Sequence, residues 1–471
     1  MNPALSFQFF YPEIVLLAGA FLVLTLDFLA RGGKWLGILA LFILAIAAVI
    51  SATPPGSLPL FYGCFKLDPF THLFRYAACA TSAGGILLSL GFKRLKNYRG
   101  EYYSLFLFMA FALILMAAAA NLLMIYLAIE FVSLLSYLLV GFLKRDPAGK
   151  EAAIKYFLFG SFSSGLMLFG MSLLFGASGS IELFIIQQRL LEPVFFPIVL
   201  TGSLLFLAGI GFKISMAPFH FWAPDAYEGA PTPVTAFLTV GPKALGFVIL
   251  TRIMVLMVPW FGDRWETGLS LLAILTMTTG NLLAIAQINI KRLLAYSSIA
   301  QAGYILIGIA AVSKLGIIAI TVYLLAYIVT NLGAFTAVQI ASENSGTDDL
   351  ASYEGLSKRA PALAACLTFF LLSLAGIPPM AGFIGKLYVF SAALQSNLII
   401  LAVAAAINSI IAAFYYFKIV RLMYLTPSRS ESSMTWPFAL NIALGICLAG
   451  TIAIGLFPAP FIAFLERFVI V

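Results

Sequence analysis

Several ionisable residues of this chain lie inside long apolar stretches. The run LLMIYLAIEFVSLLSYLLVGF, residues 122–142, contains one acid, Glu130. The run is long enough to cross a bilayer, which takes about 20 residues, and a carboxylate at its centre costs roughly 2.5–3.5 kcal/mol. Charged residues placed at that cost usually serve an ion or proton pathway. Lysines interrupt other apolar runs in the same way: Lys155, Lys213, Lys243 and Lys386.

Prolines accompany three of these lysines: Pro218 follows Lys213, Pro242 precedes Lys243, and Pro378–Pro379 precede Lys386. A proline removes one helical hydrogen bond, and in lipid the freed carbonyl must be satisfied by protein or water. The pattern therefore predicts discontinuous helices around a hydrated interior. The alternative is a simple proline kink, with each lysine reaching towards a helix end. That alternative suits Lys155 best, because it lies near the start of its segment.

Glu130 belongs to a polar stripe. Tyr126, Glu130, Ser133 and Tyr137 are spaced by four, three and four residues, which places them on one helical face. This face is expected to look into the protein and to meet a buried lysine. If such an ion pair opens, the desolvated lysine releases its proton more readily. The residues predict a proton relay, and a static salt bridge that only fixes helix packing is the alternative.

The histidines add one candidate to the relay. His220 follows Lys213 by two turns in APFHFWAPDAY, and histidine titrates near neutral pH. A structural histidine is the alternative, and His72 has no assigned role. Asp225 and Glu228 are expected in a Pro/Gly-rich turn without a catalytic role.

Motifs for bound cofactors do not occur in the sequence. It contains no GxGxxG, Walker A or nucleophile-elbow motif. Its cysteines, Cys64, Cys79, Cys366 and Cys447, are far apart and form no CxxC pair. We therefore expect no nucleotide, flavin, haem, iron–sulfur or metal site, and no redox chemistry in this chain.

Composition indicates the class of protein that must position these residues. The 471 residues are 62% hydrophobic and only 10% charged, whereas soluble domains carry about 25% charged residues. The mean hydropathy is +1.05. These values predict an all-α polytopic membrane protein. The net charge of +8 lies in short clusters between apolar runs, which argues against nucleic acid as a partner. No cleavable signal peptide is evident at the start.

Apolar length predicts about 14 spanning segments. Their expected centres are residues 20, 44, 80, 110, 132, 165, 210, 246, 277, 303, 328, 375, 411 and 448. Basic residues cluster in every second connection, for example at Lys93/Arg94 and at Lys144/Arg145. The positive-inside rule places these connections in the cytoplasm and both termini on the outer side.

A weak internal repeat divides the chain. The stretch from Asn121 resembles the stretch from Asn281, and two further pairs of segments match in the same order at offsets of about 160–169 residues. Chance similarity of Leu-rich helices is the alternative. The predicted units are residues 1–100 (helices 1–3), 101–260 (first five-helix repeat), 261–425 (second five-helix repeat) and 426–471 (helix 14).

Three segments resemble a known family. They are KISMAPFHFWAPDAYEGAPTPVTAFLTVGPKA (213–244), KRLLAYSSIAQAGY (291–304) and LAGIPPMAGFIGK (374–386). They resemble the proton-pumping, antiporter-like subunits of respiratory complex I, the NADH–quinone oxidoreductases, and the resemblance covers essentially the whole chain. WAPDAYEGAPTPVTAF is closest to the N type of these subunits. The L type has an additional lateral helix, and the M type usually has Glu where Lys386 stands.

The resemblance implies a fold and a role for each residue. It implies two inverted repeats with broken helices 7 and 12. Glu130 resembles the acid of the fifth helix, which is paired with Lys213, while Lys243 resembles the central lysine and Lys386 the terminal one. Three further residues match positions along the central hydrophilic axis: Lys155, His220 and Lys291. Many relatives have His where this chain has Gln301, which cannot titrate, so proton transfer there would need water.

The implied function is proton translocation by a non-redox subunit, driven by quinone reduction elsewhere in the complex. NADH, FMN, iron–sulfur clusters and quinone are then expected in partner subunits, and other complex I membrane subunits are the expected neighbours. The implied location is the bacterial inner (plasma) membrane, with both termini periplasmic. A subunit of a Mrp-type cation/proton antiporter is one alternative, and a purely structural membrane spacer is another.

Overall fold

The computed structural model describes residues 3–30, 33–51, 56–95, 98–428 and 434–469. Within these residues, twelve helices are long and apolar enough to cross a membrane. Two shorter apolar helices, Lys34–Val49 and Pro361–Ala375, contain the predicted centres 44 and 375. The prediction of an all-α polytopic membrane protein is confirmed.

The elements follow one another along the chain as a nearly unbroken series of helices. Their bounds are α1 (Pro3–Gln8), α2 (Tyr11–Ala30), α3 (Lys34–Val49), β1 (Leu58–Leu60), η1 (Phe61–Gly63), β2 (Phe65–Leu67), α4 (Pro69–Leu90), α5 (Arg99–Ala118), α6 (Leu122–Val140), α7 (Pro147–Ser178), α8 (Leu183–Arg189), η2 (Pro193–Phe195), α9 (Phe196–Ile214), α10 (Trp222–Gly229), α11 (Thr232–Phe261), α12 (Asp263–Ile285), α13 (Ile290–Ala310), α14 (Lys314–Ser345), η3 (Leu350–Tyr353), α15 (Leu356–Arg359), α16 (Pro361–Ala375), α17 (Ala381–Gln395), α18 (Ile399–Leu425), α19 (Phe438–Leu456) and α20 (Pro458–Glu466).

Polar residues at the helix starts explain several of these bounds. Asn121 begins α6 by accepting a hydrogen bond from the Met124 amide at 2.9 Å. Asn289 begins α13 by accepting from the Lys291 amide at 2.9 Å. Each cap satisfies amides that would otherwise lack a partner, which costs most where water is scarce.

One small departure from the all-helical expectation lies near the N-terminus. The strands β1 and β2 form an antiparallel pair in which Leu58 faces Leu67 and Leu60 faces Phe65. The side chains of Leu60, Phe65 and Leu67 are buried in a small cluster of their own. The short hairpin thus satisfies backbone groups between α3 and α4, where the apolar runs are interrupted.

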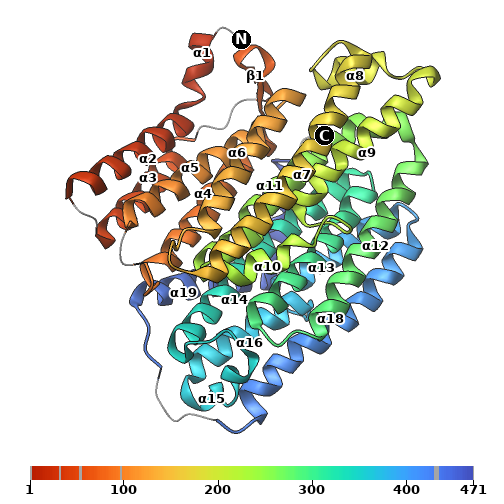
Figure 1. Ribbon diagram of the computed structural model, residues 1–471. Coiled ribbons are helices and arrows are strands. Elements are labelled where there is room, and N and C mark those ends of the chain that lie inside the picture. The colour runs from red at the N-terminus through yellow and green to blue at the C-terminus, as the bar shows by residue number, and fades with distance from the viewer. Residues whose placement is uncertain (1–2, 31–32, 52–55, 96–97, 429–433, 470–471) are drawn as a thin grey trace.

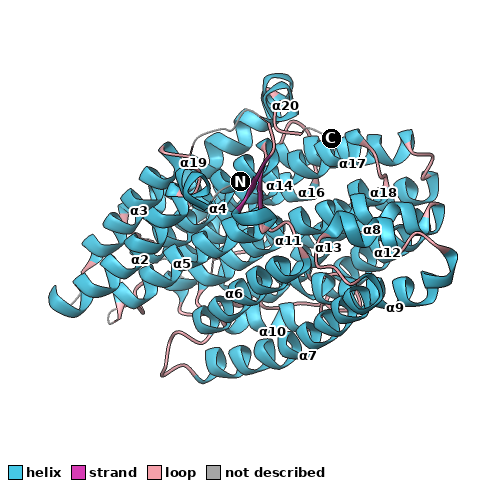
Figure 2. Cartoon of the chain, turned by 90° about the horizontal axis from the view of Figure 1, so that it is seen from above, coloured by secondary structure: helices cyan, strands magenta, loops and turns pink. Residues whose placement is uncertain are grey.

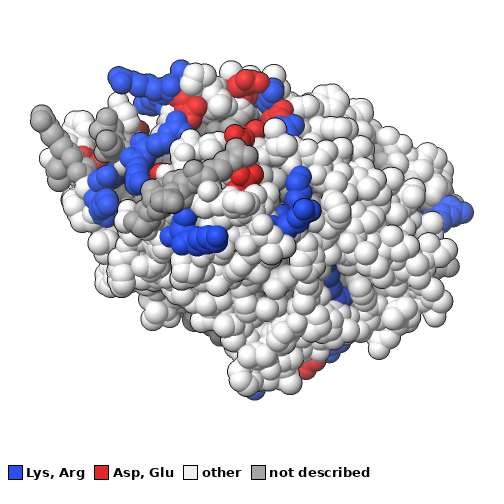
Figure 3. Space-filling model, turned by 90° about the horizontal axis from the view of Figure 1, so that it is seen from below, with Lys and Arg blue, Asp and Glu red and all other residues white. Residues whose placement is uncertain are grey.

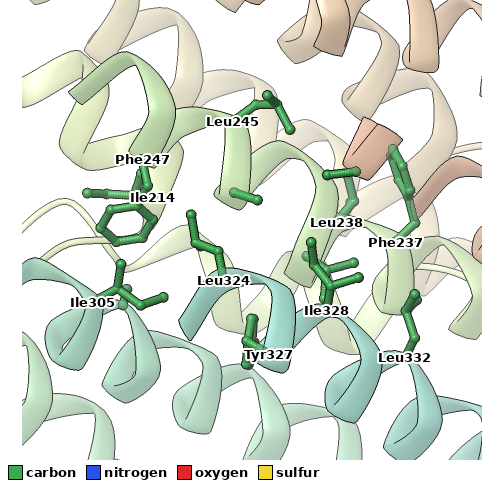
Figure 4. Close-up of a cluster of buried hydrophobic side chains, with 14 of the residues drawn as sticks. Ile214, Phe237, Leu238, Leu245, Phe247, Ile305, Leu324, Tyr327, Ile328 and Leu332 are labelled. Atoms are coloured by element: carbon green, nitrogen blue, oxygen red, sulfur yellow. The ribbon is translucent and has the colours of Figure 1, made fainter. Parts of the chain in front are cut away.

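The helices pack side by side but not in chain order, because α19, near the C-terminus, returns to contact α4 and α14 (Figure 1). α2 and α3 lie at one end, and α12 and α18 lie at the opposite end, in both the side view and the view from above (Figure 1, Figure 2). The two central helices α11 and α13 are almost completely buried. Around them, Ile214, Phe247, Ile305 and Leu324 gather where α9, α11, α13 and α14 meet (Figure 4).

The outer surface is apolar over large areas. Phe28, Ile400 and Ile410 are among the large hydrophobic side chains that are mostly exposed. In the view from below, charged side chains gather in one part of the face and much of the rest carries no charge (Figure 3). Such a surface fits a lipid environment, because apolar side chains cost nothing there.

Two pairs of helices are separated by non-helical connections at the predicted positions. α9 ends at Ile214 and α10 begins at Trp222, while α16 ends at Ala375 and α17 begins at Ala381. That each pair crosses the membrane as one broken helix remains a prediction. The division into repeats at residues 100, 260 and 425 also remains a prediction.

Close packing of α7 on α9 depends on glycine. A Cβ atom added at Gly170 would lie 2.5 Å from the Gly202 carbonyl oxygen, so the helices would have to move apart. We expect Gly170→Ala to destabilise the protein by about 1–3 kcal/mol, a typical cost of overpacking. The lowered Tm of the purified protein would measure this cost.

Gly165 in the same helix provides the matched control, because a Cβ atom there has nothing within 4 Å. Gly165→Ala should leave the Tm unchanged or slightly raised, since alanine is the better helix former by about 1 kcal/mol. Equal Tm values for the two variants would contradict the close-packing argument.

Candidate functional site

Lys213 lies in the last turn of α9 and is almost completely buried, with 3% exposure. A cation is favoured at this end of a helix, because the last carbonyl groups carry partial negative charge. The Lys213 Nζ donates a hydrogen bond to Ser133 Oγ at 3.0 Å. Ser133 in turn donates to the Ile129 carbonyl oxygen at 2.8 Å. The lysine therefore reaches the predicted polar stripe of α6.

The expected direct pairing of Lys213 with Glu130 is not present. The Glu130 carboxylate instead accepts a hydrogen bond from Ser164 of α7, and among the described residues no ion pair within 4 Å joins it to Lys213. The reason is geometric, because Lys213 meets the stripe at Ser133, about one turn along α6 from the acid. Glu130 is half-buried, and a serine hydroxyl stands in place of the predicted contact.

Lys243 lies in the middle of α11 and is 1% exposed. Its Nζ donates to both the carbonyl oxygen and the Oγ of Ser298 on α13. The expectation that Pro242 interrupts this helix is wrong, because α11 runs unbroken from Thr232 to Phe261. The carbonyl that Pro242 leaves without its helical partner belongs to Leu238. Tyr227 Oη donates to this carbonyl at 3.3 Å, so the helix continues without an unsatisfied group.

Lys386 lies on α17 and is also buried. Its Nζ donates to the Ala375 carbonyl oxygen at 2.8 Å and lies 4.5 Å from the centre of the Tyr304 ring. Gly376 ends α16 in the left-handed region, with φ +88°, and a Cβ there would lie 2.6 Å from the lysine Cδ. Glycine is thus required both for the turn and for the room that the lysine occupies.

Lys291 lies in the first turn of α13 and is buried. Its Nζ donates to the Ala230 carbonyl oxygen at 2.7 Å, just after α10, and lies 3.6 Å from Asp348 Oδ2. Lys291 therefore connects the start of α13 to the segment between α10 and α11, whereas Lys243 connects the middle of α11 to α13.

Lys155 does not join the buried lysines. Its side chain is 42% exposed, and its Nζ lies 2.7 Å from Glu151 and 3.2 Å from Asp225. The interpretation of Asp225 and Glu228 as loop-forming residues is wrong, because both lie on helix α10. Both carboxylates accept hydrogen bonds from Arg292, at 2.5 and 2.7 Å. These residues form a charged cluster that connects α7, α10 and α13.

His220 lies in the connection between α9 and α10 and is buried. Its ring stacks on Phe221 at 4.5 Å, and its Nδ1 has no hydrogen-bond partner among the described residues. Among the described residues, no hydrogen bond joins His220 to Lys213 or to Lys243. Its part in proton transfer therefore remains a prediction.

One buried ion pair was not predicted from the sequence. Glu13 on α2 and Arg75 on α4 lie 2.5 Å apart, with side-chain exposures of 0% and 3%. The signal was available, because both are charged residues in apolar helical runs, as Glu130 is. Arg75 also donates to the Phe9 carbonyl oxygen at 3.0 Å.

A further missed pair ties α11 to the start of α4. Arg252 donates to both carboxylate oxygens of Asp68, at 3.0 and 2.9 Å. Burial raises the pKa of Asp68, but the charge and hydrogen bonds of Arg252 outweigh it and lower the pKa to about 2. Asp68 therefore stays ionised as the N-cap of α4, where it accepts from the Thr71 amide.

The described residues contain no group of three or more His, Cys, Asp or Glu side chains that could hold a metal ion. What the structure does bring together is a series of buried amino groups, each held by a hydroxyl or a backbone carbonyl. Lys213, Lys243 and Lys386 are all of this kind. None of these three amino groups is held by a carboxylate among the described residues.

A membrane bundle with buried lysines inside it is typical of ion-translocating membrane proteins. Comparison with known families assigns the chain within that class. Residues 119–412 match the family described as "NADH:quinone oxidoreductase/Mrp antiporter, TM". The chain belongs to this family.

Relatives and solved structures agree with the family. The chain is 41% identical to "NADH-quinone oxidoreductase subunit N 2" of Sorangium cellulosum, over 98% of this chain and 97% of the relative. It is similar to a chain of respiratory complex I from Thermus thermophilus, with 30% identity, a TM-score of 0.81, and coverage of 96% of this chain and 98% of that chain. A chain of the Mrp complex from Dietzia sp. shares the fold, at 22% identity and a TM-score of 0.79, over 100% of this chain and 97% of that chain.

Proposed function

We propose that this chain is a proton-translocating membrane subunit of a complex I-type NADH–quinone oxidoreductase, of the N type. The observation that carries the proposal is the set of buried lysines that bond to neutral groups, together with the 41% identity to a subunit N. The chain supplies groups that hold and move protons. The electron carriers NADH, FMN, iron–sulfur clusters and quinone belong to partner subunits.

The proton path follows the order of the lysines along the bundle. Glu130 of α6 is bonded to Ser164 of α7. Lys213 of α9 is bonded to Ser133, which lies about one turn further along α6. A shift that brings Glu130 to Lys213 would hold the lysine in its charged form, and a shift back to serine would favour release of its proton. Lys243 and Lys386 would then accept and release the proton in turn. Glu130 is the switch of this scheme, and Lys386 is its exit-side group.

The expected surroundings follow from the same assignment. Neighbouring antiporter-like and small membrane subunits cover part of the apolar surface, and lipid covers the rest. The location is the bacterial inner membrane, with both termini on the periplasmic side according to the distribution of basic residues.

Replacement of Lys213 tests the proposal. In the assembled complex, Lys213→Ala should lower proton translocation per NADH oxidised by about a hundredfold, because a positioned proton-transfer group is lost. The exposed Lys150 at the start of α7 provides the control, since Lys150→Ala removes an equal charge outside the bundle. Proton uptake into membrane vesicles and NADH oxidation are measured together. Normal translocation by the Lys213 variant would refute the relay.

Two measurements separate the alternatives. A Mrp-type antiporter subunit would co-purify without flavin or iron–sulfur proteins, although it shares the fold. A structural spacer would lose assembled complex in the Lys213 variant but keep normal translocation per assembled complex. The amount of complex and its translocation are therefore quantified separately.

A further inference from the structure

Gln301 lies between two of the buried lysines on one face of α13. Ser298, which holds Lys243, precedes it by three residues, and Tyr304, whose ring lies beneath Lys386, follows it by three. Residues at this spacing lie on the same side of a helix. Gln301 is buried, with 2% exposure. An uncharged amide therefore occupies the middle of the route between Lys243 and Lys386.

The contacts of Gln301 determine which end of its amide is which. The Nε2 atom lies 3.0 Å from the Leu374 carbonyl oxygen. A carbonyl can only accept a hydrogen bond, so the amide nitrogen must face it. The other end, Oε1, can only accept as well, and the Tyr323 hydroxyl therefore donates to it. The second hydrogen of Nε2 points to Tyr416 Oη at 3.3 Å.

This orientation also fixes one contact of Tyr416. Tyr416 Oη accepts from Gln301 and lies 2.5 Å from Ser297 Oγ, so a second hydroxyl contact follows on from the amide. The hydrogen-bonded groups form a continuous series from Tyr323 through Gln301 and Tyr416 to Ser297, in which the direction of the Tyr323–Gln301 and Gln301–Tyr416 bonds is set by the amide. Reversing the amide would place two acceptors against each other at Leu374, which leaves buried groups unsatisfied and is costly.

The same amide holds the end of α16 beside Lys386. Leu374, whose carbonyl accepts from Gln301, immediately precedes Ala375, whose carbonyl accepts from Lys386. Loss of the bond to Leu374 would free the last turn of α16 and with it the group that holds the lysine.

We propose that Gln301 is the positioning residue of the link between Lys243 and Lys386. It does not carry the proton, because an amide does not titrate. It sets the direction of the Tyr323 hydroxyl, donates to the Tyr416 hydroxyl and holds the Leu374–Ala375 turn, so that Lys386 stays turned towards α13. This inference rests on the proposed function, since it concerns the proton route of the same site.

The test compares two replacements of Gln301 in the complete complex. Gln301→Met keeps the length and volume of the side chain but removes the amide. We expect it to lower protons translocated per NADH oxidised by about tenfold, because the three hydrogen bonds of the amide, to Leu374, Tyr416 and Tyr323, are lost. Gln301→His restores a donor and an acceptor, and it should recover more than half of the wild-type value.

Gln339 provides a matched control. It is also buried, and it lies in the last two turns of α14. Its Nε2 donates to the carbonyl oxygen of Leu88 on α4 at 3.0 Å, not to a group that holds one of the buried lysines. Gln339→Met should leave the proton-to-NADH ratio of the assembled complex unchanged. Wild-type translocation in Gln301→Met, an equal loss in Gln339→Met, or no recovery in Gln301→His would each overturn the inference. If Lys213→Ala also translocates normally, the proposed function itself fails, whereas a loss only in Lys213→Ala refutes the role of Gln301 alone.

Discussion

Replacing Lys243 with methionine is expected to lower proton translocation by the assembled complex by about a hundredfold, the lower end of the contribution of a positioned proton-transfer group. Lys243 is enclosed in the middle of α11, and among the described residues its amino group bonds to Ser298 on α13 alone. It therefore stands between Lys213 on one side and the Gln301 region on the other. Methionine keeps most of the volume but cannot bind a proton.

The fold should tolerate this replacement. Methionine removes an expensive buried charge, and the Ser298 carbonyl keeps its helical hydrogen bond, so the amount of complex should be close to wild type. Lys314→Met at the exposed start of α14 serves as the control for loss of a lysine. Proton uptake by vesicles at equal complex content is the measurement. Translocation within twofold of wild type in the Lys243 variant would show that the proton does not pass this residue.

The second large effect is on stability and concerns the Glu13–Arg75 pair. Arg75→Met should destabilise the protein by about 3–5 kcal/mol, because Glu13 would remain buried without its partner. The amount of assembled complex in the membrane should fall accordingly. The double replacement Glu13→Met with Arg75→Met should recover most of this loss, since apolar residues often replace a buried ion pair at little cost.

An exposed ion pair gives the contrast for this prediction. Arg94 and Asp146 lie 2.6 Å apart, but the arginine side chain is 60% exposed. Arg94→Met should therefore change the stability by less than about 1 kcal/mol. Complex content and Tm of the purified complex are the readouts. If the double variant is as unstable as Arg75→Met, the loss comes from packing and not from the unpaired charge.

The sequence predicted the helices well because membrane helices leave a strong local signal. About 20 apolar residues in a row are required to cross a bilayer, and each predicted centre falls on or beside a helix. The hairpin of β1 and β2 was missed, since strands of three residues carry no such signal. α10 was missed for a related reason, because WAPDAYEG combines turn-forming residue types with a helical spacing.

The candidate site was only partly predictable. The free-energy cost of a lysine inside an apolar segment was enough to identify Lys213, Lys243 and Lys386, because lysines at such positions usually have a function. Their partners were not predictable, because a lysine amino group can donate a hydrogen bond to any oxygen within reach. Two of the three bond to backbone carbonyl oxygens, which every residue carries and no sequence pattern marks. The expected direct contact of Glu130 with Lys213 was wrong for a different reason, because the hydroxyl of Ser133, on the same face of α6, accepts the hydrogen bond from Lys213.

Residue type and burial cost by themselves determined that this chain spans a membrane and carries buried proton-binding groups. The tertiary structure decided which groups meet. It set Lys155 in a surface cluster with Asp225, and it placed Gln301 against Leu374 and two tyrosines. The physical reason is that the two kinds of interaction depend on different parts of the chain. The free energy of placing a segment in the membrane depends on that segment's own residues. A hydrogen bond of about 3 Å depends instead on how α13, α14, α16 and α18 pack together.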